Sequence, residues 1–408
     1  MRTEVVSHPD GTRASWHPAR WRQFRALQPP GWPESVGLRG IRAQLLRRAP
    51  LVAPEEVLAL RRQLADVAEG RALVLQMGDC AETFALPARA DIAGAVALSR
   101  EAAGIVGDRL RTPVIAVGRI AGQFAKPRSS LTEDVDGVRL PAFRGDLVND
   151  CRPDELSRRP EPRRLLWGYE HAARTLSLLR ESGEGGRPAL WTSHEALVLD
   201  YEEPLTRWDD RNGGWVLCST HFPWVGERTR HPDSAHVRFL AGVANAVGSK
   251  VGPTTTPRDI VRLAQVLDPD RRPGRLVLIA RMGADRVEEG LPGLVEALRQ
   301  AGHPAIWLCD PMHGNTVRSR SGLKTRHMSA VLGEIRGFTR AVRRGGGRPG
   351  GLHLEATADG VTECVGGRCG TLESQVPDRY LTACDPRLNA DQTREAVECF
   401  ADEMMAEF

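Results

Sequence analysis

Eight short apolar runs, separated by segments with helical spacing, narrow the folds open to this chain more than any other feature. Each run ends in a polar or glycine-containing cluster. The eight runs begin at Ala72, Pro113, Ala189, Val216, Gly248, Arg275, Ala305 and Gly350. Alternation of buried-strand runs with amphipathic segments such as TPRDIVRLAQVL predicts parallel β-α units. Eight units favour a closed (β/α)8 barrel of the TIM type over an open sheet, with the polar clusters at the C-terminal strand ends, where barrel active sites form.

The first 70 residues differ from the rest. Residues 1–50 are rich in Trp, Pro and Arg and show no sustained period, which is typical of an arm that packs across a domain. Residues 54–69 have helical spacing, with Pro54 suited to a first turn and Gly70 to the C-terminal end. We therefore expect an N-terminal arm and helix in 1–70 and a single catalytic barrel in 71–408. The long interval 119–188 is expected to hold more than one helix and extra loop.

Composition excludes several classes of protein. The 408 residues carry 56 basic and 52 acidic groups, a net charge of +4, with no long single-sign block, which argues against nucleic-acid binding. No apolar run approaches the roughly 18–20 residues needed to span a bilayer, and the N-terminus has no apolar segment of signal-peptide length. The eight cysteines are too sparse for a disulfide scaffold. We expect a cytoplasmic protein with no membrane partner.

Candidate metal ligands stand at separate strand ends, since the chain has no paired CxxC and no HExxH motif. They are Cys80 after the first run, His313 after the seventh, Glu355 at the end of the eighth, and Asp385 beyond it. One thiolate, one imidazole and two carboxylates would suit Mn²⁺, Co²⁺, Fe²⁺ or Zn²⁺ with a position open for substrate. Taken singly, Cys80 can also be a buried thiol and Glu355 a surface carboxylate.

Basic side chains gather at the same strand ends. Arg119, Lys126 and Arg128 interleave with Gly and Ser in the loop after the second run, where guanidinium groups can bind carboxylate or phosphate. The alternative is a solvated basic loop. Lys250 and Arg281 end apolar runs, so each is either aimed into a site or buried at high cost. Cations converging on one mouth predict a dianionic or doubly phosphorylated set of ligands.

An imidazole and a carboxylate, those of His194 and Glu195, follow the third run. They could form an acid-base pair, although support of neighbouring site residues is the favoured interpretation. Asp359, Glu363, Cys364 and Cys369, beyond the eighth run, are interpreted mostly as structural.

The order of these motifs resembles the class II 3-deoxy-D-arabino-heptulosonate 7-phosphate (DAHP) synthase family over nearly all of the chain. The resembling segments are GDCAE (78–82), VGRIAGQFAKPRS (117–129), TSHEAL (192–197), WVGERTR (224–230), RMG (281–283), CDPMHGNT (309–316), KTRH (324–327), TEC (362–364) and CDPRLN (384–389). The family joins phosphoenolpyruvate to erythrose 4-phosphate and releases phosphate. Chance agreement of so many segments in family order is very improbable.

The resemblance implies a role for each matching residue. The four ligands named above would hold the metal, and Mn²⁺ or Co²⁺ is the expected ion. Phosphoenolpyruvate would be bound by Arg119, Lys250 and Arg281 with Glu227 nearby, and Glu227 and Lys250 would position a water and handle its proton. The aldose phosphate would contact Arg128, Ser129, Arg228 and Lys324, and Lys126 is counted among the substrate-binding residues. The family also implies a homo-oligomer and association with a chorismate-pathway enzyme.

Departures from the family pattern leave alternatives open. Met77 stands where the family usually has glycine and Ala284 where it usually has asparagine, so altered specificity is expected at these positions. The family's N-terminal signature is blurred at residues 28–32, and the chain lacks most of a helical insertion linked to feedback inhibition. Such short members often serve secondary metabolism. One rival is therefore a paralogue using another phosphorylated aldose, such as an amino-sugar analogue.

Two further hypotheses concern the same site. The first is an inactive regulatory barrel that binds a partner enzyme, against which the intact set of four ligands argues. The second is a redox switch, in which loss of metal allows Cys80 and Cys384 to form a disulfide if their Cα atoms lie within about 7 Å.

Overall fold

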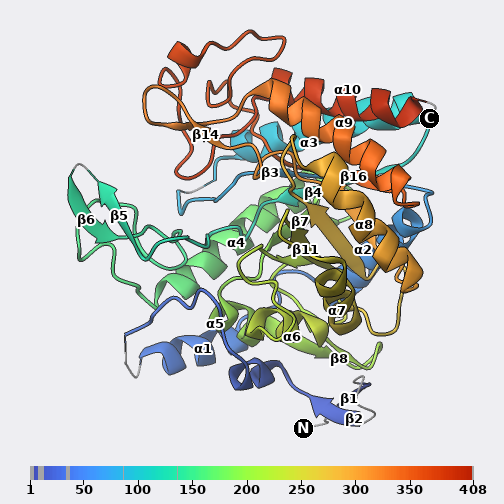
Figure 1. Cartoon of the computed structure of the whole chain (residues 1–408). Helices are drawn as coiled ribbons and strands as arrows, with labels where there is room; N and C mark the ends of the chain where they lie inside the picture. The colour runs from blue at the N-terminus through green and yellow to red at the C-terminus, as the bar shows by residue number, and fades with distance from the viewer. Residues whose placement is uncertain (1–3, 8–12, 34–36, 86, 136, 407–408) are drawn as a thin grey trace.

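Eight parallel strands close into a barrel in the computed structural model of the chain, which describes residues 4–7, 13–33, 37–85, 87–135 and 137–406 (Figure 1). The barrel strands are β3 (Leu73–Gly78), β4 (Val114–Arg119), β7 (Trp191–Glu195), β10 (Phe222–Val225), β11 (Val247–Val251), β12 (Leu276–Ala280), β13 (Ile306–Cys309) and β16 (Pro349–Glu355). Each strand pairs with the barrel strands that precede and follow it in sequence, and β16 closes the circle against β3. The predicted (β/α)8 fold is confirmed.

Helices surround this barrel on its outside (Figure 1). They are α1 (Gly37–Arg47), α2 (Pro54–Ala68), α3 (Arg89–Leu110), α4 (Arg164–Glu181), α5 (Leu199–Glu202), α6 (Ala235–Ala241), α7 (Pro257–Leu267), α8 (Val287–Gln300), α9 (Met328–Arg344) and α10 (Ala390–Met405). Three short 3₁₀ helices are η1 (Pro18–Gln23), η2 (Glu203–Leu205) and η3 (Glu373–Gln375). Among the described residues no helix is long and apolar enough to cross a membrane.

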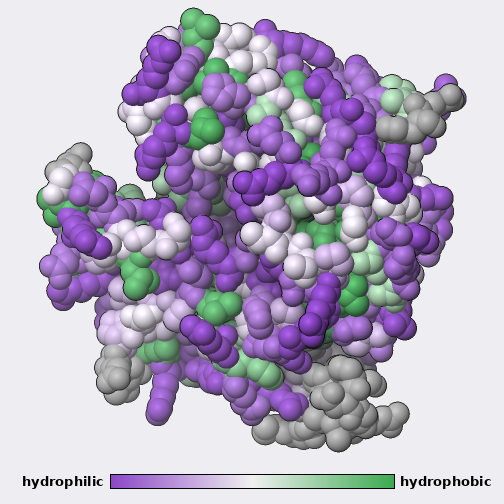
Figure 2. Space-filling model, in the orientation of Figure 1, coloured by the Kyte–Doolittle hydropathy of each residue, from purple (hydrophilic) through white to green (hydrophobic). Residues whose placement is uncertain are grey.

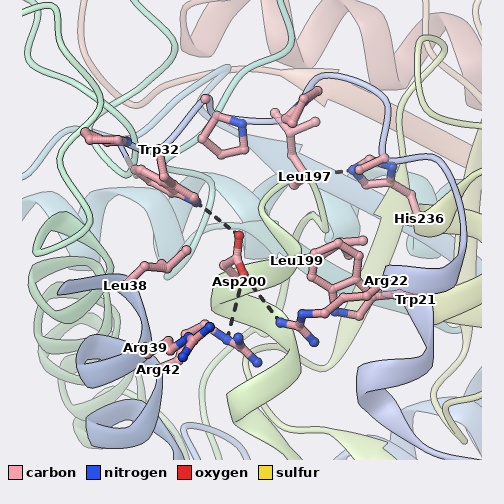
Figure 3. Close-up of a pocket in the computed structure, with 15 residues that line it drawn as sticks. Trp21, Arg22, Trp32, Leu38, Arg39, Arg42, Leu197, Leu199, Asp200 and His236 are labelled. Atoms are coloured by element: carbon pink, nitrogen blue, oxygen red, sulfur yellow. Dashed lines mark hydrogen bonds and ion pairs between the residues drawn. The ribbon is translucent and has the colours of Figure 1, made fainter. Parts of the chain in front are cut away.

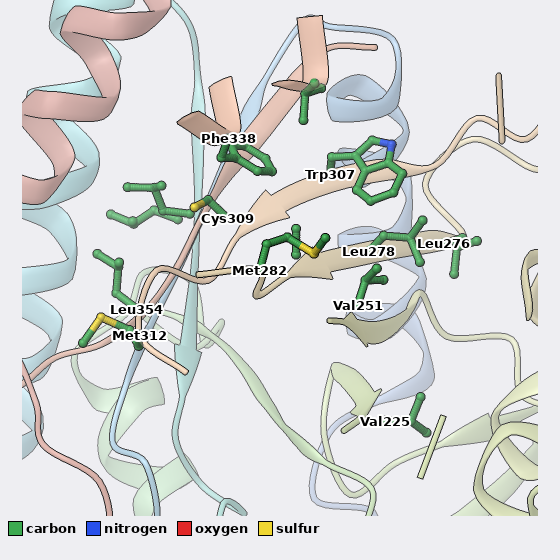
Figure 4. Close-up of a cluster of buried hydrophobic side chains, with 14 of the residues drawn as sticks. Val225, Val251, Leu276, Leu278, Met282, Trp307, Cys309, Met312, Phe338 and Leu354 are labelled. Carbon is green, nitrogen blue, oxygen red and sulfur yellow. The ribbon is translucent and has the colours of Figure 1, made fainter. Parts of the chain in front are cut away.

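Two buried layers hold the barrel together. Inside it, Val74, Val117 and Trp224 pack with residues of other strands above Leu60 and Leu64 of α2, so α2 closes the N-terminal end. Outside it, alternate residues of the same strands pack against the surrounding helices, as Cys309 of β13 does beside Phe338 of α9 in Figure 4. This period of two is the reason that interior positions near the C-terminal ends are free to carry charged side chains.

The strand register brings distant residues to one level at the C-terminal mouth. Glu355 pairs with Gly78, Gly78 with Arg119, and Arg119 with Ser193. Gly78 has a φ of 149°, and a Cβ there would lie 2.7 Å from the carbonyl oxygen of Arg119. Absence of a side chain at Gly78 therefore allows β3 and β4 to approach closely beside Glu355.

Two sequence predictions are wrong in detail. The fourth barrel strand does not begin at Val216, because β9 (Gly214–Leu217) pairs with β8 (Thr206–Asp209) and the barrel strand, β10, begins at Phe222. Val216 is apolar because it packs in a separate cluster with α1 and α4. Residues 37–47 form α1 instead of irregular arm, with Ile41 and Leu45 buried one turn apart.

The interval 119–188 also differs from expectation. In its described part it contains one α-helix, α4, and not several. The rest is the hairpin of β5 (Thr132–Val135) and β6 (Val138–Pro141) with loops tied by Asn149, whose side chain donates to the carbonyls of Ala142 at 3.0 Å and Arg158 at 2.9 Å. A small hairpin, of β14 (Val317–Arg318) and β15 (Lys324–Thr325), follows β13.

A candidate active site at the barrel mouth

Three of the four predicted metal ligands meet at the mouth. The donor atoms of Cys80, Glu355 and Asp385, all buried, lie within 4.8 Å of one another. Ligand distances of about 2.0–2.3 Å allow one ion to reach donors at such separations. The fourth candidate, His313, lies beside them, with Nε2 at 3.1 Å from Glu355 Oε1. The donor set and its spacing therefore fit a divalent transition-metal ion.

Cationic side chains enclose this group. Arg119 Nη2 lies 3.1 Å from Glu355 Oε1, and Arg326 Nη2 lies 2.7 Å from Glu355 Oε2. Although burial opposes ionisation, His313, Arg326 and Arg119 hold the pKa of Glu355 well below its usual range. The carboxylate is thus fixed as an anion inside the barrel, where an unpaired charge would be costly.

The thiol of Cys80 has two close neighbours besides Asp385. Lys126 Nζ lies 2.8 Å from Cys80 Sγ, and Lys126 also pairs with Asp385. Burial, contact with Cys384 and the charge of Glu355 raise the pKa of the Cys80 thiol. The redox switch between Cys80 and Cys384 stays a hypothesis.

Asp310 links the metal group to Lys250. It accepts from Lys250 Nζ and lies 2.7 Å from His313 Nδ1, so it fixes the orientation of both side chains. Burial lowers the pKa of Lys250 to about 8, against the attraction of Asp310. Arg281 completes this side of the mouth by donating from Nη2 to the carbonyl of His313 at 2.7 Å.

A buried chain of hydrogen bonds supports Arg119 from inside the barrel. Its Nη1 lies 3.0 Å from His353 Nε2, and His353 Nδ1 lies 2.7 Å from Gln76 Oε1. Gln76 Nε2 donates to Ser193 Oγ at 2.9 Å, which donates to the carbonyl of Gly118 at 2.8 Å. Because Arg119 can only donate, His353 accepts at Nε2 and donates from Nδ1, so every bond runs in one direction back to β4.

Two carboxylates, at or just beyond the C-terminal ends of the neighbouring strands β7 and β10, have buried oxygens with no hydrogen-bond partner among the described residues. They are Glu195 Oε1 and Glu227 Oε2. Gly226 and Gly252 make room for them, since a Cβ would lie 2.2 Å from Glu195 Oε1 and 2.9 Å from Glu227 Cδ respectively. Burial raises the pKa of Glu195, while Lys250 and His313 oppose that shift. Unsatisfied buried acceptors at a mouth are suited to a water or a protonated substrate group.

The remaining predicted substrate residues lie outside the barrel strands, on loops and on β15. Lys324 Nζ pairs with Asp385 Oδ1 at 2.7 Å, and Arg128 pairs with Glu133 of β5. Ser129 and Arg228 are exposed, although the charge of Arg228 is felt by Glu195. Figure 2 shows this region as a hollow between the β5–β6 hairpin and the C-terminal loops, bordered by hydrophilic residues.

His194 and Glu195 separate into two roles. His194 Nε2 lies 2.9 Å from Glu202 Oε1, and its ring lies against Gly122, where a Cβ would be 2.2 Å from Nδ1. It therefore supports the loop after β4, whereas Glu195 faces the mouth.

The sequence patterns did not identify Asp310, Arg326 or the Gln76–His353 pair as residues of the site. Asp310 could have been predicted, because it follows the buried strand β13 directly, at the strand end that also led to His313.

The two departures from the family pattern lie outside the metal group. Met77 lines a cavity with Glu82 and Arg119, and its effect on specificity stays a prediction. Its side chain faces away from the barrel interior and packs in the outer layer with Leu98 and Leu354. The alternation of strand side chains explains this, since Gly78 is the interior position. Ala284 lies beside the His313 loop, where its N–H donates to Asn315 Oδ1 at 3.1 Å.

Comparisons with known proteins agree with this geometry. A family model described as the class-II DAHP synthetase family matches residues 16–190 and 186–401. The chain is 47% identical over 378 residues to a probable phospho-2-dehydro-3-deoxyheptonate aldolase of Pseudomonas fluorescens, covering 91% of this chain and 94% of the relative. It is 40% identical over 422 residues to a phospho-2-dehydro-3-deoxyheptonate aldolase of Streptomyces coelicolor, with the same two coverages, 91% and 94%.

A solved structure of phospho-2-dehydro-3-deoxyheptonate aldolase from Francisella tularensis shares the fold, with a TM-score of 0.54 at 14% identity over 89% of this chain and 96% of that one. At that identity the likeness concerns the fold alone. The family model and the two relatives carry the assignment: the chain belongs to the class-II DAHP synthetase family and is an enzyme of that family.

Proposed function

We propose that this enzyme condenses phosphoenolpyruvate with erythrose 4-phosphate in a metal-dependent reaction that yields 3-deoxy-D-arabino-heptulosonate 7-phosphate and phosphate. The observation that carries the proposal is the gathering of Arg119, Lys250 and Arg281 around the buried group of Cys80, Glu355 and Asp385. Cations beside a transition-metal donor set suit one anionic and one carbonyl substrate.

The substrate residues divide between the two anions. Arg119, Lys250 and Arg281 would bind the carboxylate and phosphate of phosphoenolpyruvate. The aldose phosphate would be bound by Lys126, Arg128, Ser129, Arg228 and Lys324. Holding two mutually repelling anions in reactive geometry would supply much of the rate enhancement. The repulsion itself would be reduced by the surrounding cations.

Cys80, His313, Glu355 and Asp385 would hold a divalent ion, with Mn²⁺ or Co²⁺ favoured over Fe²⁺ or Zn²⁺. When bound, such an ion supplies Lewis-acid polarisation of the aldehyde. Asp310 fixes the ring of His313 through Nδ1 and leaves Nε2 toward the metal group. This carboxylate-imidazole contact is a common support for a ligating histidine.

Chain residues would also manage the water and proton. Carbon C3 of phosphoenolpyruvate bonds to the aldehyde carbon, and water adds at C2. Glu227, with Oε2 free of a hydrogen bond, is placed to orient that water and accept its proton, and Lys250 at a pKa of about 8 is placed to hold or return a proton. The C2–O bond to phosphate then breaks, and Arg119 and Arg281 stabilise the departing charge.

Phosphate release from phosphoenolpyruvate tests the proposal directly. The purified enzyme would be assayed with Mn²⁺ or Co²⁺, with and without erythrose 4-phosphate, and again after EDTA. We expect release only when the aldose and the metal are both present. Release with an amino-substituted aldose phosphate but not with erythrose 4-phosphate would identify the amino-substituted compound as the substrate. No release from metal-loaded enzyme with any aldose phosphate would overturn the proposed reaction.

A further inference from the structure

The N-terminal arm, residues 16–33, is anchored to the segment that follows β7. Trp32 Nε1 donates to Asp200 at 3.0 Å, and Trp21 Nε1 donates to Glu203 at 2.7 Å. Figure 3 shows Trp32 and Arg42 directed toward Asp200 from opposite sides. Indole and guanidinium donors on two carboxylates therefore fix the arm to the barrel at Trp21 and Arg22 on one side of Gln28 and at Trp32 on the other.

Between these anchors the arm contacts the predicted aldose-phosphate loop. The backbone N–H of Arg128 donates to Gln28 Oε1 at 2.9 Å. Arg144 binds the arm at the same place. Its Nη2 donates to the carbonyl of Gln28 and its Nη1 to the carbonyl of Pro29, both at 2.6 Å. The carbonyl of Arg144 in turn accepts from the N–H of Lys126 at 2.9 Å.

The loop backbone is therefore held at two points, Lys126 and Arg128, and both lead to the arm. The first connection passes through Arg144 and the second is direct. Neither residue belongs to a strand, since β4 ends at Arg119 and β5 begins at Thr132. Without these contacts the loop would be held near the proposed aldose-phosphate residues mainly by side-chain ion pairs, of Lys126 with Asp385 and of Arg128 with Glu133.

The backbone at Gln28 is unusual. Its φ is 61°, in the left-handed region that residues other than glycine, asparagine and aspartate rarely adopt. Such a conformation persists when surrounding contacts over-determine it, and these residues cluster where function requires them. Here Arg144 holds this backbone conformation through the carbonyls of Gln28 and Pro29. In this conformation the side-chain amide of Gln28 is directed toward Arg128.

We propose that Gln28 is a positioning residue for the aldose phosphate, holding the Lys126–Arg128 loop from outside the barrel. The inference rests on the proposed function for the identity of the ligand and on the two backbone contacts for the positioning. It assigns a role to the part of the arm where the family signature is blurred. Arg119, Lys250 and Arg281 are held by strand ends and buried partners, so Gln28 acts on one substrate only.

The test compares Gln28→Gly with Arg111→Gly. Glycine favours the left-handed backbone at both positions, since Arg111 has a φ of 51°, but Arg111 caps α3 before the start of β4, at the opposite end of that strand from the loop. Hydrogen exchange of peptides covering residues 120–135 and steady-state kinetics would be measured for both. In Gln28→Gly we expect faster exchange there, about a fivefold higher KM for erythrose 4-phosphate, and KM for phosphoenolpyruvate within twofold of wild type.

A conservative variant separates the hydrogen bond from bulk. Gln28→Glu keeps the accepting oxygen, so exchange in 120–135 should stay near wild type, and Arg111→Gly should change neither exchange nor KM. Unchanged exchange in Gln28→Gly, or an equal rise of both KM values, would overturn the inference. Should wild-type enzyme release no phosphate with any aldose phosphate, the proposed function fails, while the exchange comparison still decides whether Gln28 holds the loop.

Discussion

The two halves of the site differ in how their cations are held. Arg119 and Lys250 are 3% and 6% exposed, project from barrel strands and pair with buried carboxylates. Arg128 and Lys324 are 25% and 37% exposed, and both lie outside the barrel strands, on the rim of the mouth. The inner half is fixed by the same contacts that stabilise the barrel, whereas the outer half depends on neighbouring loops and the arm.

The contrast between the inner and outer halves indicates where substrate specificity can change. A buried cation cannot be moved without leaving a buried carboxylate unpaired, so the inner half is constrained to one ligand, which we assign as phosphoenolpyruvate. The outer half can be altered at little cost to folding because its ion pairs are screened by water. A paralogue that uses another aldose would therefore differ from this enzyme mainly in the loops.

The largest effect is expected from Arg119→Ala. The change leaves Glu355 with Arg326 and His313 and removes a donor from the proposed phosphoenolpyruvate site, so kcat/KM should fall on the order of a thousandfold. The free energy of unfolding should fall by about 3–5 kcal/mol, as for a broken buried pair. Urea unfolding and phosphate release would be measured together.

Lys324→Ala is the matched change in the outer half. It should lower the free energy of unfolding by about 1 kcal/mol or less, because Lys324 is more than one-third exposed. A similar loss of stability in both variants would show that the two halves are not held differently.

A smaller effect is expected from Gln76→Leu. The substitution interrupts the chain from Arg119 to Gly118 and leaves His353 Nδ1 and Ser193 Oγ without their partner. Each lost partner should cost about 1–3 kcal/mol of stability. Loosening of Arg119 should raise KM for phosphoenolpyruvate more than KM for the aldose, and the ratio of the two KM values is the measurement. An unchanged ratio with reduced stability would make the chain structural only.

Residue patterns predicted the inner half better than the outer. Cys80, Glu355 and Arg119 follow from strand ends, because a closed barrel brings all its C-terminal ends to one ring. The arm contact could not be predicted, because the register between Gln28 and Arg128 depends on loop conformations that no period encodes. The side that Met77 faces is simpler to predict, since adjacent strand residues face opposite sides and Gly78 takes the interior position.

The pH dependence should also separate the halves. Burial lowers the pKa of Lys250 to about 8, so this side chain loses its charge as pH rises through 8. We expect kcat/KM for phosphoenolpyruvate to fall above pH 8, approaching tenfold per pH unit. Lys250→Arg should remove this decline, whatever its overall activity, because arginine stays charged.

Unfolding would not explain such a decline. A lysine whose pKa is lower in the folded than in the unfolded chain binds fewer protons when folded, so between about pH 8 and 10.4 its contribution to stability rises with pH. Thermal midpoints measured from pH 7 to 9.5 in parallel would check this. A decline that persists in Lys250→Arg would assign the titration to another group.

The smallest effect is expected from Arg128→Lys. Arg128 is held through its backbone N–H by Gln28 and through its side chain by Glu133, and lysine keeps the charge and the backbone contact while losing the planar fork. We expect KM for erythrose 4-phosphate to rise about three- to tenfold, KM for phosphoenolpyruvate to stay within twofold, and the urea midpoint to be unchanged. If the loop is as replaceable as its exposure indicates, the same variant assayed with other aldose phosphates should change their relative kcat/KM values. A variant that loses activity with every aldose equally, with KM for phosphoenolpyruvate rising as well, would instead place Arg128 in the inner half and remove the distinction between the two.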